Sequence, residues 1–310
     1  MTIEHPILSV NNLSHKYQIQ WAVKDIDFEI TRKGIYGLLG ANGAGKSTIM
    51  NIMSGVLNQS HGEVFIKGIN IKEQPIEAKK KIGFLPQKPP LLLEMTVEEF
   101  LIHAARLRLM DRIAIPEAVD IVLEKCALTH FKRRVLSNLS GGYQQRVGIA
   151  QAIIHNPEIV IFDEPTNGLD PNQILEVRKL IKSIAEERTV ILSTHILQEV
   201  QALCDQIWMI HEGTMVFTGS LHDFDTHLSP SVLKVILKGL PSTSELEDIP
   251  GILSACHMEK AEYHLEYDLN EETLERLVEK SMEKGWRLIE IVREKKSLEN
   301  VFATLSQHRK

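Results

Sequence analysis

The sequence predicts an α/β protein with a mixed, largely parallel core sheet, followed by a smaller α+β domain. The first two thirds of the chain alternate short apolar runs with helical segments, the pattern of a parallel sheet flanked by helices. A glycine-rich loop joins one of these runs to the helix that follows it. After about residue 220 the pattern changes, and a length of 310 residues is enough for about two domains.

The strands of the first domain fall into two kinds. Alternating apolar and polar residues predict an antiparallel β subdomain formed by Leu8–Val10, Ala22–Ile30 and Glu63–Ile71. Continuous apolar runs that end at polar residues predict buried parallel strands, with chemistry at their carboxyl ends. These runs are Gly34–Leu39, Glu158–Phe162 and Thr189–Ser193.

Residues from about 88 to 138 interrupt the strand pattern. Their apolar residues recur at helical spacing through Val97–Leu109 and again through Ala118–Cys126. We therefore expect a helical insertion within the first domain, which spans residues 1–220.

Residues 221–310 predict a separate accessory domain. Strand and helix patterns follow one another in the order βαββαβ, which is that of a ferredoxin-like split motif. The domain has no phosphate loop and no cluster of titratable residues, so we expect a structural or regulatory role. The segments are Val232–Lys238, Ser242–Glu247, Ile252–Met258, Tyr263–Tyr267, Glu271–Lys284 and Arg287–Arg293, with a final helix over Ser297–Ser306.

The composition is that of an ordinary globular protein. Hydrophobic residues make up 43% and charged residues 25%, which excludes collagen-like, disordered and disulfide-scaffold proteins. A net charge of −6 gives no basic field for nucleic acid. The three scattered cysteines, Cys126, Cys204 and Cys256, favour a reducing compartment. No apolar run approaches the ~18 residues of a membrane span and the start is no signal peptide, so we expect any membrane role to require a partner.

The glycine-rich loop Gly40–Thr48 matches the phosphate-loop pattern G-x-x-x-x-G-K-[ST]. Its glycines allow backbone N–H groups to face phosphate oxygens, and the N-terminus of the helix Lys46–Met53 favours the same anion. Lys46 supplies a positive charge to the phosphates and Ser47 a hydroxyl ligand for Mg²⁺. The alternative is a simple turn, but the strand before and the helix after are the context that phosphate binding requires. The predicted nucleotide-binding residues of this loop are Asn42, Gly43, Ala44, Gly45, Lys46, Ser47 and Thr48.

Two carboxylates follow the predicted strand that ends at Phe162. Asp163 is placed to hold Mg²⁺ directly or through water, and Glu164 to polarise an attacking water. Acidic residues at a strand end are often only solvent-facing. Beside a phosphate loop, we favour the catalytic interpretation.

The string Leu139–Arg146 reads LSGGYQQR and predicts the start of a helix that runs to His155. Ser140 is a candidate N-cap, while Gly141 and Gly142 would let an anion approach the free N–H groups. Taken alone, the string also fits an ordinary capped helix.

Together these motifs resemble the ATP-binding cassette (ABC) superfamily, and the resemblance covers residues 1 to about 220. Gly40–Thr48 resembles the Walker A loop, Ile159–Glu164 the Walker B strand, Leu139–Gln145 the signature and Asn167–Pro171 the D-loop. Three further site residues come from the resemblance. Gln87 occupies the Q-loop position, which senses Mg²⁺ and the attacking water, His195 the switch-histidine position, and Tyr17 the place of an aromatic that stacks on adenine. Tyr17 and His195 also have plain structural interpretations, in hairpin packing and in a turn.

The resemblance implies a P-loop NTPase that hydrolyses ATP with Mg²⁺. It also implies a cassette dimer around two ATP molecules, in which Ser140 and Gly142 contact the γ-phosphate held by Lys46 of the other cassette. We expect a homodimer and a separate transmembrane permease, with no nucleic-acid partner, on the inner face of the cell membrane. Lys88–Leu93 would contribute to the permease groove, although its leucines could equally pack inside the insertion.

The tail narrows the expected subfamily. Ser297–Phe302 after a ferredoxin-like domain resembles the ATPases of type-2 permeases, which serve mostly export. A soluble cassette protein acting on ribosomes is the alternative, but such proteins usually carry two cassettes and basic segments. A chromosome ATPase would need a long coiled coil between Walker A and signature, and residues 49–138 contain no heptads. A nucleotide-gated protein without hydrolysis is disfavoured by Glu164 and His195.

Overall fold

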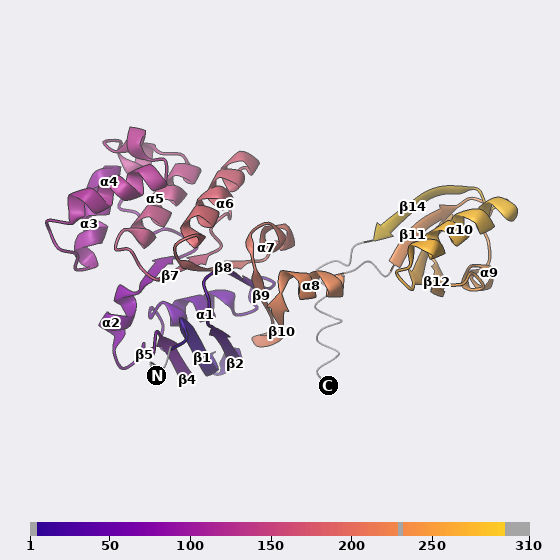
Figure 1. Ribbon diagram of the computed structural model, residues 1–310, viewed down its shortest axis with the longest axis horizontal. Helices are drawn as coiled ribbons and strands as arrows, with labels where there is room; N and C mark the ends of the chain where they lie inside the picture. Colours follow the sequence, from indigo (N-terminus) through magenta and orange to yellow (C-terminus); the bar gives the residue numbers. More distant parts are fainter. Residues whose placement is uncertain (1–4, 229–231, 295–310) are drawn as a thin grey trace. The chain divides into compact units, whose positions relative to one another are not determined.

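The computed structural model describes residues 5–228 and 232–294. Its contacts divide the chain into two compact units, the first ending at Leu221 and the second beginning at His222 (Figure 1). Within the described residues, no helix is long and apolar enough to cross a membrane.

A six-stranded sheet forms the centre of the first unit. Its strand order is β10-β9-β3-β8-β7-β6, and every pair is parallel except β9 with β10. All residues of β3, β7 and β8 are buried, as the continuous apolar runs predict. The strands are β3 (Ile35–Leu39), β6 (Ile82–Leu85), β7 (Ile159–Asp163), β8 (Thr189–Thr194), β9 (Gln206–His211) and β10 (Thr214–Ser220).

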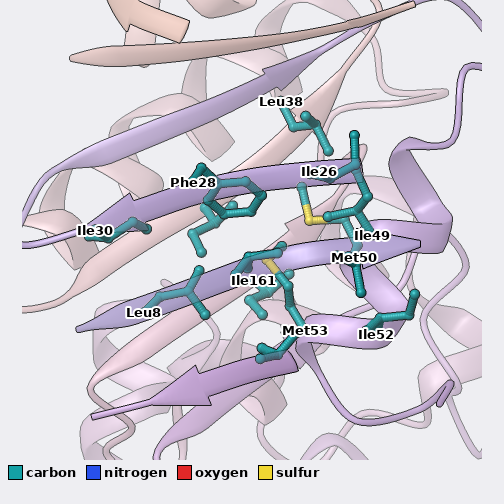
Figure 2. Packing of buried hydrophobic residues seen from close by; sticks show 14 of the residues in the cluster. Leu8, Ile26, Phe28, Ile30, Leu38, Ile49, Met50, Ile52, Met53 and Ile161 are labelled. Atoms are coloured by element: carbon teal, nitrogen blue, oxygen red, sulfur yellow. The ribbon is translucent and has the colours of Figure 1, made fainter. Parts of the chain in front are cut away.

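An antiparallel sheet with the order β2-β1-β4-β5 forms the second layer of this unit. Its strands are β1 (Leu8–Tyr17), β2 (Gln20–Ile30), β4 (His61–Ile66) and β5 (Ile69–Asn70). Helix α1 (Lys46–Met53) contributes Ile49 and Met53 to a hydrophobic core that also contains Leu8 of β1 and Ile161 of β7 (Figure 2). One core therefore joins both sheets to the helix that follows the phosphate loop.

The helical insertion is present between β6 and β7. Helix α3 (Val97–Leu107) begins at a capping box, in which the Thr96 side chain accepts from the Glu99 N–H and the Glu99 side chain accepts from the Thr96 N–H. Helix α4 (Ile115–Lys125) begins earlier than its apolar spacing predicts, because a proline occupies its first turn, where no N–H is needed. The other helices of the unit are α2 (Pro75–Lys80), the 3₁₀ turns Thr129–Phe131 and Leu136–Asn138, α5 (Gly141–Ile153), α6 (Pro171–Ala185) and α7 (Leu197–Leu203).

The second unit has its own sheet and its own core. Its first helix, α8 (Leu221–Leu228), is followed by elements in the order βαββαβ, and the sheet order is β12-β13-β11-β14 with every pair antiparallel. Tyr263 and Leu277 belong to its core. The elements are β11 (Val232–Leu237), α9 (Thr243–Glu247), β12 (Ile252–His257), β13 (Glu262–Tyr267), α10 (Glu271–Glu283) and β14 (Leu288–Glu294). The helix predicted over Ser297–Ser306, and the Ser297–Phe302 string, lie outside the described residues.

Candidate active site

The phosphate loop connects β3 to α1, and Gly45 is the N-cap of that helix. Gly45 has φ +108°, and a Cβ added there would lie 2.5 Å from Cγ1 of Val23 and 2.7 Å from the carbonyl oxygen of Ala22. Only glycine fits this position. Gly43, with φ +82°, would meet no heavy atom within 4 Å, so the loop is open on that side.

Lys46 lies at the first position of α1 with only 4% of its surface exposed. Its Nζ donates to the carbonyl oxygens of Gly40 at 2.9 Å and Ala41 at 3.1 Å. It also lies 3.4 Å from Oε1 of Glu164. A buried ammonium held by two carbonyls and one carboxylate is fixed in place beside the phosphate loop.

Asp163 and Glu164 are positioned by the pairing of β7 with β8. Asp163 lies opposite Ser193 in the parallel register, and the Ser193 hydroxyl donates to Oδ1 of Asp163 at 2.5 Å. The same hydroxyl oxygen accepts from the backbone N–H of Glu164 at 2.9 Å. Glu164 has φ +49°, an uncommon conformation for a residue with a side chain, and its carboxylate lines the cavity described below.

Three side chains from three separate segments meet at the Glu164 carboxylate. Nε2 of Gln87 donates to Oε2 at 3.0 Å, and Nδ1 of His195 lies 3.3 Å from Oε1. Because a carboxylate can only accept, Nδ1 of His195 carries the proton in this contact. With Lys46 as the third partner, the Glu164 carboxylate is the group that all three side chains contact.

A cavity of about 890 Å³ opens beside this carboxylate. The loop residues and Glu164 line one part of it, and the β1–β2 hairpin lines another through Tyr17 and Trp21. Tyr17 is 52% exposed, so its ring is available to a flat ligand. The predicted residues gathered here are Tyr17, Asn42, Gly43, Gly45, Lys46, Ser47, Thr48, Gln87, Glu164 and His195.

Some predicted residues lie elsewhere. Ala44 is buried within the loop, and Asp163, 3% exposed, lies directly before Glu164 in the chain but does not line the cavity. Ser140, Gly141 and Gly142 also lie outside it.

Ser140 is the N-cap residue of α5, as predicted. Its backbone angles are extended, but within the described residues no capping hydrogen bond reaches its side chain. The turn therefore begins without side-chain help. Instead, Gln145 of the same helix donates to the carbonyl oxygen of Pro165 at 2.7 Å, and so ties α5 to the loop after Glu164.

Several residues of the site carry no signal that we used. Ser193 could have been found from the pairing of two predicted parallel strands, which places it opposite Asp163. Gln20 and Trp21 of β2 and Glu212 after β9 line the cavity because distant segments pack there, which no local pattern predicts. Asn167, the first residue of the string that resembles the D-loop, lines it as well.

The oxygen donors of the site suit Mg²⁺. The described residues contain no group of three or more His, Cys, Asp or Glu that could hold a metal ion. Ser47 nevertheless offers a hydroxyl in the cavity, and Gln87 an amide oxygen, since its amide nitrogen is the atom bound to Glu164. Hard oxygen donors with few protein ligands are typical of a cation that also binds phosphate oxygens.

Comparison with known proteins identifies related chains. A family model described as "ABC transporter" matches residues 23–167. The chain is 37% identical over 212 residues to a bacitracin transport ATP-binding protein of Bacillus licheniformis, which covers 68% of each chain. It is 34% identical over 221 residues to the ABC transporter ATP-binding protein NatA of Bacillus subtilis, which covers 69% of this chain and 90% of NatA.

Solved structures agree with this relationship. The structure of cbiO1 from Clostridium perfringens, part of the ABC transporter complex cbiONQ, is 30% identical with a TM-score of 0.66 and covers 72% of this chain and 92% of its own. A dimeric ATP-binding cassette in a post-hydrolysis state, bound to ADP and Pi, is 26% identical with a TM-score of 0.63. That match covers 69% of this chain and 98% of the other.

Proposed function

This chain belongs to the ABC transporter family and is an ATPase, and from that premise we propose that it is the ATP-hydrolysing subunit of a membrane exporter. It acts as a cassette dimer around two ATP molecules and drives a separate permease. The observation that carries this proposal is the convergence of Lys46, Gln87 and His195 on the carboxylate of Glu164, beside a phosphate loop.

Hydrolysis requires a positioned water and a stabilised phosphate charge. Glu164 accepts a hydrogen bond from the water and takes its proton as the oxygen–phosphorus bond forms. The bond between the γ-phosphorus and the bridging oxygen breaks, and ADP leaves with the electron pair. Lys46 and the loop N–H groups stabilise the charge on the phosphate oxygens, and His195 orients Glu164 through its Nδ1.

Ser47 and Gln87 would hold Mg²⁺ through their side-chain oxygens. Asp163, which is buried and accepts from Ser193, would bind the same cation directly or through water. When bound, Mg²⁺ neutralises charge on the β- and γ-phosphate oxygens.

Dimerisation completes each site. The residues Ser140 to Gly142 lie outside the cavity that contains Lys46, which supports a role for them at the γ-phosphate held by the other cassette. ATP then joins the two cassettes, and its hydrolysis removes the group that both of them hold. A pair of identical chains is the simplest such dimer.

The permease binds at the start of the helical insertion. Leu92 and Leu93 are 44% and 48% exposed, which does not fit their burial inside the insertion. A groove of about 440 Å³ is lined by residues that follow them in the chain, among them Met95 and Ile102. Binding there places the chain on the inner face of the cell membrane.

The Glu164→Gln variant tests the catalytic proposal. Gln cannot take the proton, so we expect steady-state ATP hydrolysis to fall by about 100-fold or more, while ATP still binds and holds the dimer together. Phosphate release measures the first effect and size-exclusion chromatography with ATP the second. Glu73→Gln, an exposed change of the same chemistry, is the matched control. Normal turnover by Glu164→Gln would contradict the assignment.

A further inference from the structure

Glu199 is a buried carboxylate that the proposed mechanism does not use. It lies in the first turn of α7, is 2% exposed and does not line the nucleotide cavity. Burying an ionised carboxylate is unfavourable unless hydrogen bonds and opposite charge compensate for the lost water. Its partners therefore indicate what it holds in place.

The two oxygens of Glu199 bind different loops. Oε1 accepts from the Thr166 hydroxyl, and Oε2 accepts from the Thr194 hydroxyl at 2.7 Å. Both threonines are almost fully buried. Arg178 of α6 contributes charge from 3.9 Å, the distance between its Nη2 and Oε1. The Thr194 oxygen also accepts from the N–H of Ile196 at 3.0 Å, which holds the turn that contains His195.

These two loops carry groups of the active site. Thr194 directly precedes His195, whose ring contacts Glu164. Thr166 follows Glu164 by two residues and precedes Asn167, which lines the cavity. The same loop continues to Asp170, whose side chain caps α6 by accepting from the N–H groups of Asn172 and Gln173. One carboxylate thus bridges the loop of His195 and the loop that runs from Glu164 to α6.

We propose that Glu199 is a positioning residue that sets the geometry between His195 and Glu164. The proposal rests on the proposed ATPase function and adds a control point to it. The loop continues into Asn167–Pro171, which resembles the D-loop, so a displacement of this segment would reach His195 through Glu199. Coupling of this kind needs a contiguous physical link between the two loops, and the hydrogen bonds of Glu199 supply one.

A role of Glu199 in fold stability alone and a role in positioning predict different effects of its substitution. If Glu199 only stabilised the fold, its loss would lower the melting temperature without a selective effect on the chemical step. A positioning role predicts that kcat falls while nucleotide affinity stays, because the phosphate loop makes no contact with Glu199 in any described hydrogen bond or ion pair. A small displacement of reacting groups is enough for a large loss of rate.

The test compares Glu199→Ala with Glu199→Gln in the full-length protein. For Glu199→Ala we expect kcat for ATP to fall about 10- to 100-fold, with the KM for ATP and the Kd for ADP within about twofold of wild type. Gln retains one acceptor and gains a donor that either threonine oxygen can accept, so we expect kcat to recover to within about fivefold of wild type. Tyr36→Phe, which removes one partly buried hydrogen bond to the carbonyl oxygen of Arg32, is the stability control.

Thr166→Val and Thr194→Val extend the test if Glu199→Ala folds poorly. Each removes one hydroxyl, and we expect each to lower kcat and to show non-additive effects when combined with Glu199→Gln. Hydrogen exchange at the backbone amides of residues 164–170 and 194–199 measures how firmly Glu199 holds the two segments, and it needs no ATP turnover. We expect both segments to exchange faster in Glu199→Ala. Unchanged kcat, or equal losses of kcat and ADP affinity, would overturn the positioning role. Absence of ATP turnover in the wild type would instead refute the proposed transport function. The hydrogen-exchange rates would still decide whether Glu199 links the two segments.

Discussion

At the scale of single residues, the site depends on backbone conformations that few side chains tolerate. Glu164 has φ +49° directly after a buried strand, and the pairing of its N–H with Ser193 holds it there. The turn brings the carboxylate to Gln87, His195 and Lys46. The conformational cost, on the order of 1–2 kcal/mol, is offset by these contacts.

Tyr17 gives a prediction at this scale. If its ring stacks on adenine, Tyr17→Ala weakens ATP binding about 5- to 150-fold, the equivalent of about 1–3 kcal/mol of stacking, whereas Tyr17→Phe leaves binding within about twofold. Isothermal titration calorimetry measures both. Trp21→Ala is the comparison, and we expect a smaller effect because Lys16 lies 5.6 Å over the Trp21 ring. A larger loss for Trp21→Ala would assign the stacking to Trp21.

The sequence allows prediction of residues whose role follows from covalent neighbours. The loop glycines, Lys46 and Ser47 are adjacent in the chain, and Asp163 and Glu164 end a strand that its apolar run identifies. Trp21, Glu212 and Glu199 could not be predicted in this way, because their contacts depend on how distant elements pack. At Ser140 the residue type predicts the position but not the contact. Serine is favoured at N-caps and occupies the N-cap of α5, yet its side chain accepts no capping hydrogen bond in the described structure.

At the scale of elements, the turn after α5 contains a histidine that burial keeps neutral. Nε2 of His155 lies 3.0 Å from the carbonyl oxygen of Ile82, so Nε2 carries the proton. Nδ1 is buried and has no hydrogen-bond partner in the described structure. Burial first, and then the charges of Arg108 and Arg188, lower the pKa of His155 to about 4 from its usual 6.5, although the bond to Ile82 opposes this.

The lowered pKa predicts a loss of stability in acid. Between pH 6.5 and about 4 the unfolded chain binds a proton at His155 that the folded chain does not bind. The free energy of unfolding therefore falls as pH drops through this window, by on the order of 3 kcal/mol for this group, and the group has no effect above pH 7. Urea unfolding of the first unit at pH 7, 6, 5 and 4 measures how the free energy of unfolding changes with pH.

A variant isolates the contribution of His155. His155→Gln keeps an N–H for the Ile82 carbonyl but cannot titrate, so we expect its stability to change less between pH 7 and pH 4 than that of the wild type. His130→Gln, an exposed position, is the matched control. An equally steep loss in His155→Gln would assign the acid sensitivity to other groups.

Elements proved more predictable than their ends. The buried parallel strands and α1 follow from long apolar patterns, because burial on both faces requires such patterns. Strands β1 and β2 extend beyond the predicted segments since their outer residues pair through irregular register that alternation does not reveal. Hydrogen bonding between strands, not local preference, sets those limits.

At the scale of the whole molecule, a permease partner gives the remaining prediction. Leu92→Ser combined with Leu93→Ser removes two exposed apolar side chains from the surface that we assign to the permease. We expect affinity purification from membranes to recover a polytopic subunit with the wild type and at least about 10-fold less of it with the double variant, since truncating an anchoring interface residue costs about 1 kcal/mol or more. Quantitative mass spectrometry measures the recovery.

The control variant makes the same kind of substitution, apolar to serine, away from Leu92 and Leu93. Val56→Ser and Ile76→Ser remove apolar side chains that are also exposed on the first unit. Their recovery of the polytopic subunit should match the wild type, and all four substitutions should leave ATP binding intact. Recovery of ribosomes by the wild type would instead favour the soluble alternative.

The two units are organised around separate cores. The first core contains residues of β1, β2, α1 and β7, whereas the second contains only residues of the second unit. A substitution in one core therefore need not be matched by a change in the other. In evolutionary terms, the second unit can diverge, lengthen or be exchanged between lineages while the ATP-hydrolysing part is inherited intact. The same ATP-hydrolysing unit can thereby serve new cellular functions without changes to its own core.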